Sequence, residues 1–187
     1  MLSRYIESGE LSKIREAAGP DWLPLSVALL SGLRVGDVVK MRRADVRAGG
    51  VYYVAQKTGK AGFSRLPDKV CAQLRDGPGA WCFPSPKRRG EHLTRQAVWQ
   101  RLKRAAKKAG VDPEGVSPHA LRKVYAVEHL KTEGIEAVQA ALQHDRKNVT
   151  EIYALSDWLT GENAEKPLLR RDLMAIATKI ADLLRNG

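Results

Sequence analysis

Residues 117–130 read SPHALRKVYAVEHL, and this stretch predicts a helix that carries two candidate site residues. Ser117 followed by Pro118 is a strong helix start. The serine hydroxyl can accept a hydrogen bond from a first-turn N–H group, and the fixed φ of proline suits the first helical position. His119 and Arg122 are three residues apart, so they lie on one face of that helix. The stretch therefore predicts a helix that presents an imidazole and a guanidinium together.

Outward from this helix lie three further residues that carry chemistry. Arg34 stands upstream in SGLRVGD, residues 31–37, and His144 and Tyr153 stand nine residues apart downstream in AALQHDRKNVTEIYA, residues 140–154. Two guanidiniums can hold a phosphate, imidazoles can move protons, and a phenol can attack phosphorus. The ordered set is what cleavage of a phosphodiester by a tyrosine, without a metal, requires.

Each of these residues also has a structural alternative. Arg34 could pair with Asp37, which we read as a residue that positions its own segment. His119 and Arg122 could be a surface pair, and His144 could cap a helix. Tyr153 could be a core aromatic with its hydroxyl at the surface. No histidine spacing supports a zinc site, and we expect neither a metal nor a cofactor.

The composition favours a polyanionic partner. Among 187 residues, 43% are apolar, which is enough for a folded core, and 32 Lys and Arg against 21 Asp and Glu give a net charge of +11. Nine of these cations fall between positions 87 and 108, against the single acid Glu91. A purely solvated basic surface is the alternative. From this segment we take as candidate nucleic-acid contacts Arg88, Arg95, Arg101, Arg104 and Lys108.

The patterning predicts a mainly α-helical α+β fold with a small three-stranded antiparallel sheet. Helices are expected over residues 3–18, from a cap at Asp21 to about 30, from 34 to about 41, and over 68–75. Later helices are expected at 95–109 with Thr94 as cap, from 117 to Gly134, and at 135–142, about 147–158 and about 168–185. Strands are expected at 44–46, 51–54 and 63–66, with a turn-like tip, KTGKAG, at 57–62. Cys71 and Cys82 share no metal-ligand spacing and are expected to be reduced thiols.

Four segments together resemble the catalytic domain of the tyrosine recombinases, the phage integrase and Xer-like site-specific recombinases. They are LLSGLRVGDVVKMRRADV, QKTGKAGFSRLP, SPHALRKVYAVEHL and ALQHDRKNVTEIYA, and they lie within residues 10–158. The resemblance implies that Arg34 and Arg122 clamp the scissile phosphate. It implies that Lys57 is the general acid, with Lys60 as the alternative at the same tip. It also implies that His119 and His144 assist proton transfer and phosphate binding, and that Tyr153 is the nucleophile.

The chain departs from the family pattern in three places. Lys123 stands where many members have a second histidine, and Gln143 replaces the glycine usual before His144. The N-terminal core-binding domain of the family is also absent from residues 1–187, which we take as one catalytic domain. A type IB topoisomerase-like nicking-closing enzyme and a DNA-binding module without turnover are the alternative functions.

The resemblance also implies the partners and the place of action. Double-stranded DNA is the expected partner, with self-association on DNA into a tetrameric synapse. The segment 168–185, which carries an apolar stripe, is a candidate for exchange between protomers. No apolar run reaches the length of a membrane span, so we expect a DNA-associated cytoplasmic protein of prokaryote or phage type.

Overall fold

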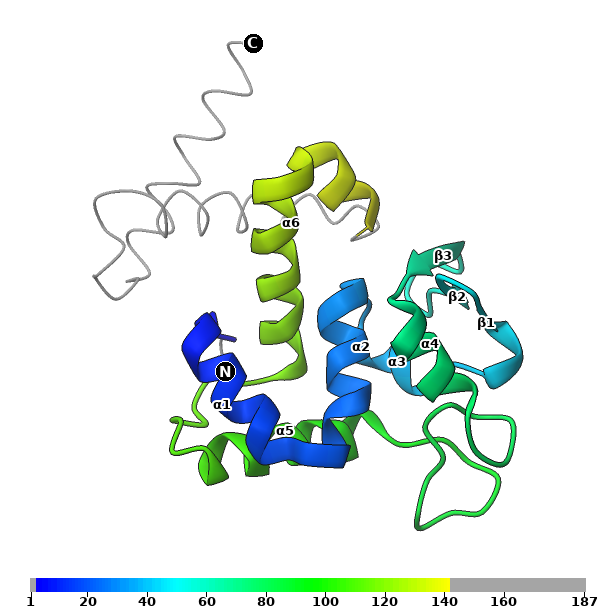
Figure 1. Ribbon diagram of the computed structural model, residues 1–187, viewed down its shortest axis with the longest axis horizontal. Coiled ribbons are helices and arrows are strands. Elements are labelled where there is room, and N and C mark those ends of the chain that lie inside the picture. Colours follow the sequence, from blue (N-terminus) through cyan, green and yellow to red (C-terminus); the bar gives the residue numbers. More distant parts are fainter. Residues whose placement is uncertain (1–2, 142–187) are drawn as a thin grey trace. The chain divides into compact units, whose positions relative to one another are not determined.

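A computed structural model of the chain describes residues 3–141, and the side chains of residues 3–129 (Figure 1). One compact unit ends at Tyr125, and a second begins at Ala126. The predicted class is confirmed: the described part is mainly helical and contains one three-stranded antiparallel sheet. The helices are α1 (Ser8–Ala18), α2 (Leu23–Ser31), α3 (Val35–Val39), α4 (Asp68–Arg75), α5 (Arg95–Lys108) and α6 (Pro118–Ala141), and the strands are β1 (Val46–Arg47), β2 (Gly50–Val54) and β3 (Ala61–Arg65).

The core of the first unit forms around α5. Helices α1 and α2 both pack against α5, and Figure 1 shows α1 running beside it. Ile14 of α1, Leu25 of α2 and Leu102 of α5 are fully buried. Each such side chain contributes roughly 1.5–3 kcal/mol through removal of apolar surface from water. Leu121 of α6 belongs to the same cluster, so this core supports the start of the helix that bears His119 and Arg122.

The N-terminal helix is shorter than predicted. A helix was expected over residues 3–18, but α1 begins at Ser8, and residues 3–7 are not helical. A capping box starts the helix, with Glu7 as N-cap residue and Glu10 accepting a hydrogen bond from the Glu7 N–H at 3.2 Å. Upstream of it the Arg4 N–H donates to the Gly115 carbonyl at 3.1 Å. A contact 111 residues away in sequence thus replaces the local helical one.

The prediction that Asp21 caps the second helix was wrong. Asp21 lies inside a short 3₁₀ turn, Gly19–Trp22, that leads directly into α2, and its side chain makes no cap hydrogen bond. The carboxylate instead forms an ion pair with Arg101 of α5, with 3.0 Å between Oδ1 and Nη1. Tertiary packing of α2 on α5 therefore decides the role of Asp21.

The sheet is a meander with the strand order β1-β2-β3. A short 3₁₀ turn, Arg43–Asp45, replaces most of the strand expected at 44–46, and β3 begins two residues earlier than expected. Tyr52 and Phe63 are cross-strand partners with ring centroids 4.9 Å apart. The opposite face packs on α4, so the β2–β3 hairpin is anchored at its base.

The caps of the last two described helices agree with the prediction. The Thr94 hydroxyl accepts a hydrogen bond from the Ala97 N–H at 3.1 Å, and the Ser117 hydroxyl accepts one from the Ala120 N–H at 3.3 Å. However, α6 continues to Ala141, so the prediction that Gly134 ends it was wrong. Glycine inside a helix lowers its stability by about 1 kcal/mol but does not by itself terminate it. The segments predicted at about 147–158 and 168–185 lie outside the described residues.

Both cysteines are free and buried. Burial raises the pKa of the Cys82 thiol to about 11 and also raises that of Cys71, so both are protonated at neutral pH. Among the described residues, no helix has the length and apolar character needed to cross a bilayer.

Candidate active site

A pocket of about 420 Å³ lies where the α2–α3 junction, the β2–β3 hairpin tip and the starts of α5 and α6 meet. It brings together four of the six residues proposed for catalysis, and with them one of the proposed DNA contacts, Arg95. The lining residues are Arg34, Val35, Gly36, Asp37, Gln56, Lys57, Arg95, Pro118, His119 and Arg122. Residues from four separate stretches of sequence thus converge on one hollow.

Arg34 enters the pocket from the turn between two helices. It is the N-cap residue of α3, and its carbonyl accepts hydrogen bonds from the Asp37 and Val38 N–H groups at 2.8 and 3.0 Å. Gly32, two residues earlier, ends α2 in the left-handed conformation with φ +63°. In the described part of the chain no ion pair joins Arg34 to Asp37, which counts against the purely structural alternative for this arginine.

Arg122 reaches the same place from the second turn of α6. Its side chain is only 6% exposed, and its Nη1 donates to the carbonyl of Gly32. Burial, and next the positive charge of Arg34, lower the pKa of Arg122 to about 10, while Asp37 acts in the opposite direction. The guanidinium remains charged at neutral pH, but its charge is costly there. A bound anion would offset both the burial and the repulsion.

The hairpin is tied to α3 below its tip. Buried Asp37 accepts a hydrogen bond from the Gln56 N–H through Oδ1 at 2.9 Å, and the Gln56 side chain donates to the carbonyl of Gly36. Lys57 follows directly and lines the pocket, whereas Lys60 is not among the lining residues. This placement favours Lys57 over Lys60, although the role of either lysine stays a prediction.

The pocket is strongly cationic. Arg34, Lys57, Arg95 and Arg122 contribute four positive charges, and Asp37 is the one carboxylate among the lining residues. His119 lies on the exposed side of the first turn of α6. Among the side chains that the structure describes, no cluster of His, Cys, Asp and Glu has the arrangement of a metal site. The chemistry suited to this set of side chains is the binding of an anion with more than one charge or of neighbouring phosphates.

A larger groove of about 1220 Å³ runs along α5 and carries most of the other predicted DNA contacts. Arg88, Arg101 and Arg104 line it, whereas Lys108 is exposed on α5 but is not among its lining residues. Arg101 is engaged by Asp21, and Arg88 lies 3.3 Å from Glu91. Of the three arginines that line the groove, Arg104 is exposed and has no ion-pair partner among the described residues.

A depression of about 540 Å³ lies between the pocket and the groove. It shares Arg95 and His119 with the pocket, and Gln96 and Trp99 with the groove. Trp99 is 36% exposed there, and sequence reasoning did not single it out. Its spacing of four residues from Arg95 and from Lys103 is the signal that could have identified it, because these three positions share one helix face. His144 and Tyr153 lie outside the described residues.

Comparison with known proteins places this chain in one family. The phage integrase family matches residues 5–158, so the chain belongs to the phage integrase family. It is 35% identical over 154 residues to the tyrosine recombinase XerD of Pseudomonas putida, covering 74% of this chain and 50% of that protein. It is 43% identical over 146 residues to XerD of Vibrio cholerae, covering 69% and 47%. The chain therefore spans about half the length of these relatives.

Solved structures agree with this assignment. The lambda integrase catalytic core is similar with a TM-score of 0.62 and 26% identity, covering 76% of this chain and 92% of that one. A lambda integrase tetramer bound to a Holliday junction has the same TM-score and 27% identity, covering 78% of this chain and 46% of that one.

Proposed function

We propose that this chain is the catalytic domain of a site-specific DNA recombinase, which cuts and rejoins DNA strands through a 3′-phosphotyrosine intermediate without a metal. The observation that supports this most is the pocket in which Arg34, Lys57, His119 and Arg122 lie together. Membership of the phage integrase family supports it as well. His144 and Tyr153 are assigned from the sequence alone.

In the proposed reaction the two arginines bind the scissile phosphate. Attack on phosphorus increases the negative charge on the non-bridging oxygens, and fixed guanidiniums stabilise that charge. Arg122 is suited to this work, because its buried and repelled charge gains an anionic partner when the phosphate enters. Hydrogen bonding to the Gly32 carbonyl holds the guanidinium in place beforehand.

The bonds change in a simple exchange. The phenolic oxygen of Tyr153 attacks phosphorus and passes its proton to a neighbouring base, for which His119 and His144 are the candidates. The bond from phosphorus to the 5′ oxygen then breaks, and that oxygen takes a proton from Lys57. The product retains a phosphodiester-type bond, so a 5′ hydroxyl can attack it and release the tyrosine. Rejoining therefore needs no outside energy source.

Arg95 extends the site beyond a single phosphodiester. Two guanidiniums suffice to bind the scissile group, and Arg95 adds a third guanidinium, which also lines the depression next to the groove along α5. We assign Arg95 to a neighbouring phosphate of the same strand, and Arg88, Arg101, Arg104 and Lys108 to the flanking duplex. Contacts of this kind release counterions, so DNA binding should weaken steeply with salt.

Complete recombination would require several copies of the chain on DNA. The lambda integrase tetramer on a Holliday junction is similar to this chain in fold. We propose a tetrameric synapse of the same kind, formed on paired sites in the cytoplasm of a prokaryotic cell. Exchange of the segment 168–185 between protomers would couple their active sites.

A covalent-trapping experiment tests the proposed chemistry. The probe is a pool of short duplexes with a randomised sequence and a nick, so that a cleaved 5′-hydroxyl fragment diffuses away and the protein stays attached. We expect a protein–DNA adduct on a denaturing gel, with or without EDTA. Sequencing of the trapped DNA would then provide the preferred site.

The matched variants are Tyr153→Phe and Tyr52→Phe. Each removes one hydroxyl, but Tyr52 is 55% exposed on the sheet and outside the pocket. Loss of the adduct in Tyr153→Phe and its retention in Tyr52→Phe are expected. An adduct that persists in Tyr153→Phe would show that another residue is the nucleophile.

A further inference from the structure

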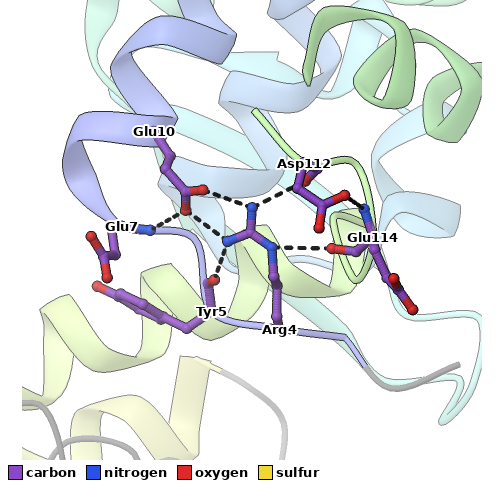
Figure 2. A network of polar contacts seen from close by, with 6 residues as sticks. All are labelled: Arg4, Tyr5, Glu7, Glu10, Asp112 and Glu114. Atoms are coloured by element: carbon purple, nitrogen blue, oxygen red, sulfur yellow. Dashed lines mark hydrogen bonds and ion pairs between the residues drawn. The ribbon is translucent and has the colours of Figure 1, made fainter. Parts of the chain in front are cut away.

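Ser3 and Arg4 bind the loop that leads into α6, at the base of the helix that carries His119 and Arg122. Arg4 uses every N–H donor of its guanidinium, as Figure 2 shows, and two of these donors bind the loop. Nε donates to the Glu114 carbonyl at 3.1 Å, and Nη2 donates to the Asp112 carbonyl at 3.2 Å. Glu10 binds the fork bidentately, at 2.7 Å through Nη1 and at 2.8 Å through Nη2. The remaining Nη1 donor takes the Tyr5 carbonyl at 3.0 Å.

Other groups of residues 3 and 4 bind the same loop. The Arg4 N–H donates to the Gly115 carbonyl at 3.1 Å, and the hydroxyls of Ser3 and Ser117 lie 3.0 Å apart. Lys123 of α6 donates to the Ser3 carbonyl at 2.9 Å. A Cβ on Gly115 would lie only 2.9 Å from the Arg4 side chain, so the approach is close. Residues 3–6, which we name the N-terminal strap, therefore contact both the loop and α6 itself.

Arg4 adds to the other contacts of this loop, which include the burial of Val116 and the hydrogen bond from Lys103 to the Pro113 carbonyl. Gly110 and Gly115 both have φ of +68°. Glycine at such positions leaves the unfolded loop with many accessible conformations. The internal Asp112 side chain accepts one hydrogen bond, from the Glu114 N–H at 2.9 Å. Three loop carbonyls, by contrast, are bound by Arg4.

We propose that Arg4 is a positioning residue for the strand-cleavage reaction, acting through the loop 112–117 on the first turns of α6. This inference rests on the proposed function. Ser117 ends the loop and caps α6, His119 follows two residues later, and Arg122 one turn further. A shift of the loop therefore moves both side chains relative to Arg34, which is held on another element. Misplacement of catalytic groups by about 1 Å can lower a rate by about a hundredfold.

Lysine should not replace Arg4, although it keeps the charge. An ammonium has three donors on one atom, whereas the planar guanidinium has five that diverge towards separate acceptors. In Arg4 all five are used, and they reach a carboxylate and three carbonyls. Arg4→Lys should retain the ion pair with Glu10 but lose the hydrogen bonds to the loop carbonyls. This variant therefore separates the effect of the positive charge from the effect of the hydrogen-bond geometry.

The test compares Arg4→Ala, Arg4→Lys and the control Lys13→Ala in the full chain. Lys13 is exposed on α1, so Lys13→Ala removes one positive charge, as Arg4→Ala does, but leaves the contacts of the loop intact. Amide hydrogen exchange is followed at the Ala120 N–H. Cleavage is measured in single turnovers over a range of protein concentrations, with the nicked duplex identified by the covalent-trapping experiment. Melting temperature serves as the check of folding.

We expect Arg4→Ala to speed exchange at Ala120 and to lower the maximal cleavage rate by about ten- to a hundredfold. The protein concentration at half-maximal rate should stay constant, Arg4→Lys should show most of the same loss, and Lys13→Ala should match the unchanged chain. If Arg4→Ala does not fold, Arg4→Lys decides the matter by itself. Unchanged exchange, or a full rate in Arg4→Lys, would overturn the proposal. Absence of cleavage in the unchanged chain would refute the proposed function instead, and exchange would still decide whether the strap fixes α6.

Discussion

Substitution of Gly32 by alanine should damage both the stability of the first unit and the catalytic pocket. Gly32 combines two constraints, because its φ is +63° and an added Cβ would lie 2.4 Å from Cδ1 of Tyr125. Its carbonyl is also the acceptor for the buried guanidinium of Arg122. One backbone position thus joins α2 to α6, and the substitution tests whether this close approach matters.

The expected cost follows from the two constraints. A left-handed alanine costs roughly 1–2 kcal/mol relative to glycine. Overlap with the ring of Tyr125 must be relieved by movement, and overpacking of this kind costs typically about 1–3 kcal/mol. Gly32→Ala should therefore lower the free energy of unfolding by about 2–5 kcal/mol. Gly49→Ala is the matched control, because φ there is +75° and no atom lies within 4 Å of the added Cβ. It should lose only about 1–2 kcal/mol.

Denaturant titration, monitored by tryptophan fluorescence, measures the loss of unfolding free energy in Gly32→Ala and in Gly49→Ala. Unchanged m-values would show that the two-state comparison is sound. The pair Gly32→Ala and Tyr125→Ala should be less damaging together than the sum of the single changes, because removal of the ring relieves the overlap. Equal losses in Gly32→Ala and Gly49→Ala, or simple additivity with Tyr125→Ala, would refute the packing argument. Cleavage should fall in Gly32→Ala even where the protein is fully folded.

Three further predictions concern the acid, the N-terminal ion pair and the groove. Lys57→Ala should abolish cleavage of ordinary DNA but still cleave a substrate whose 5′ leaving atom is sulfur, because a thiolate leaves without protonation. Lys60→Ala should cleave both substrates. If Lys60→Ala instead cleaved only the sulfur substrate and Lys57→Ala cleaved both, Lys60 would be the general acid. Hydrogen bonding from Arg4 lowers the pKa of Glu10, so this carboxylate stabilises the fold above its unfolded pKa, and that contribution is lost as the pH falls through the folded value. Acid titration of stability should therefore be shallower in Arg4→Ala, and identical curves would exclude the linkage. Arg104→Glu should reduce the slope of log K for DNA against log salt by about 0.9 if the side chain contacts one phosphate, and an unchanged slope would mean that it meets only solvent.

Much of the fold could be predicted because its signals are local. Thr94 and Ser117 start their helices through hydrogen bonds to residues three positions away, which are the contacts that capping preferences describe. The errors arose where a distant partner competed with the local signal. Arg4 binds Gly115 instead of entering a helix, and Asp21 pairs with Arg101 instead of capping one. Gly134 shows the other limit, since a weak helix breaker does not end a helix that is otherwise favoured.

The sequence by itself determined which chemistry we propose, because the identity and order of Arg34, His119, Arg122, His144 and Tyr153 match the needs of a phosphodiester exchange. It also determined the family, since the matched segments are continuous. Tertiary structure alone decided which cations share a pocket: Arg95 joins the site, Lys60 does not line it, and Arg101 is engaged by Asp21. The physical reason is that charge and periodicity are properties of local sequence, whereas the distance between two side chains depends on how helices far apart in the chain pack around a common core.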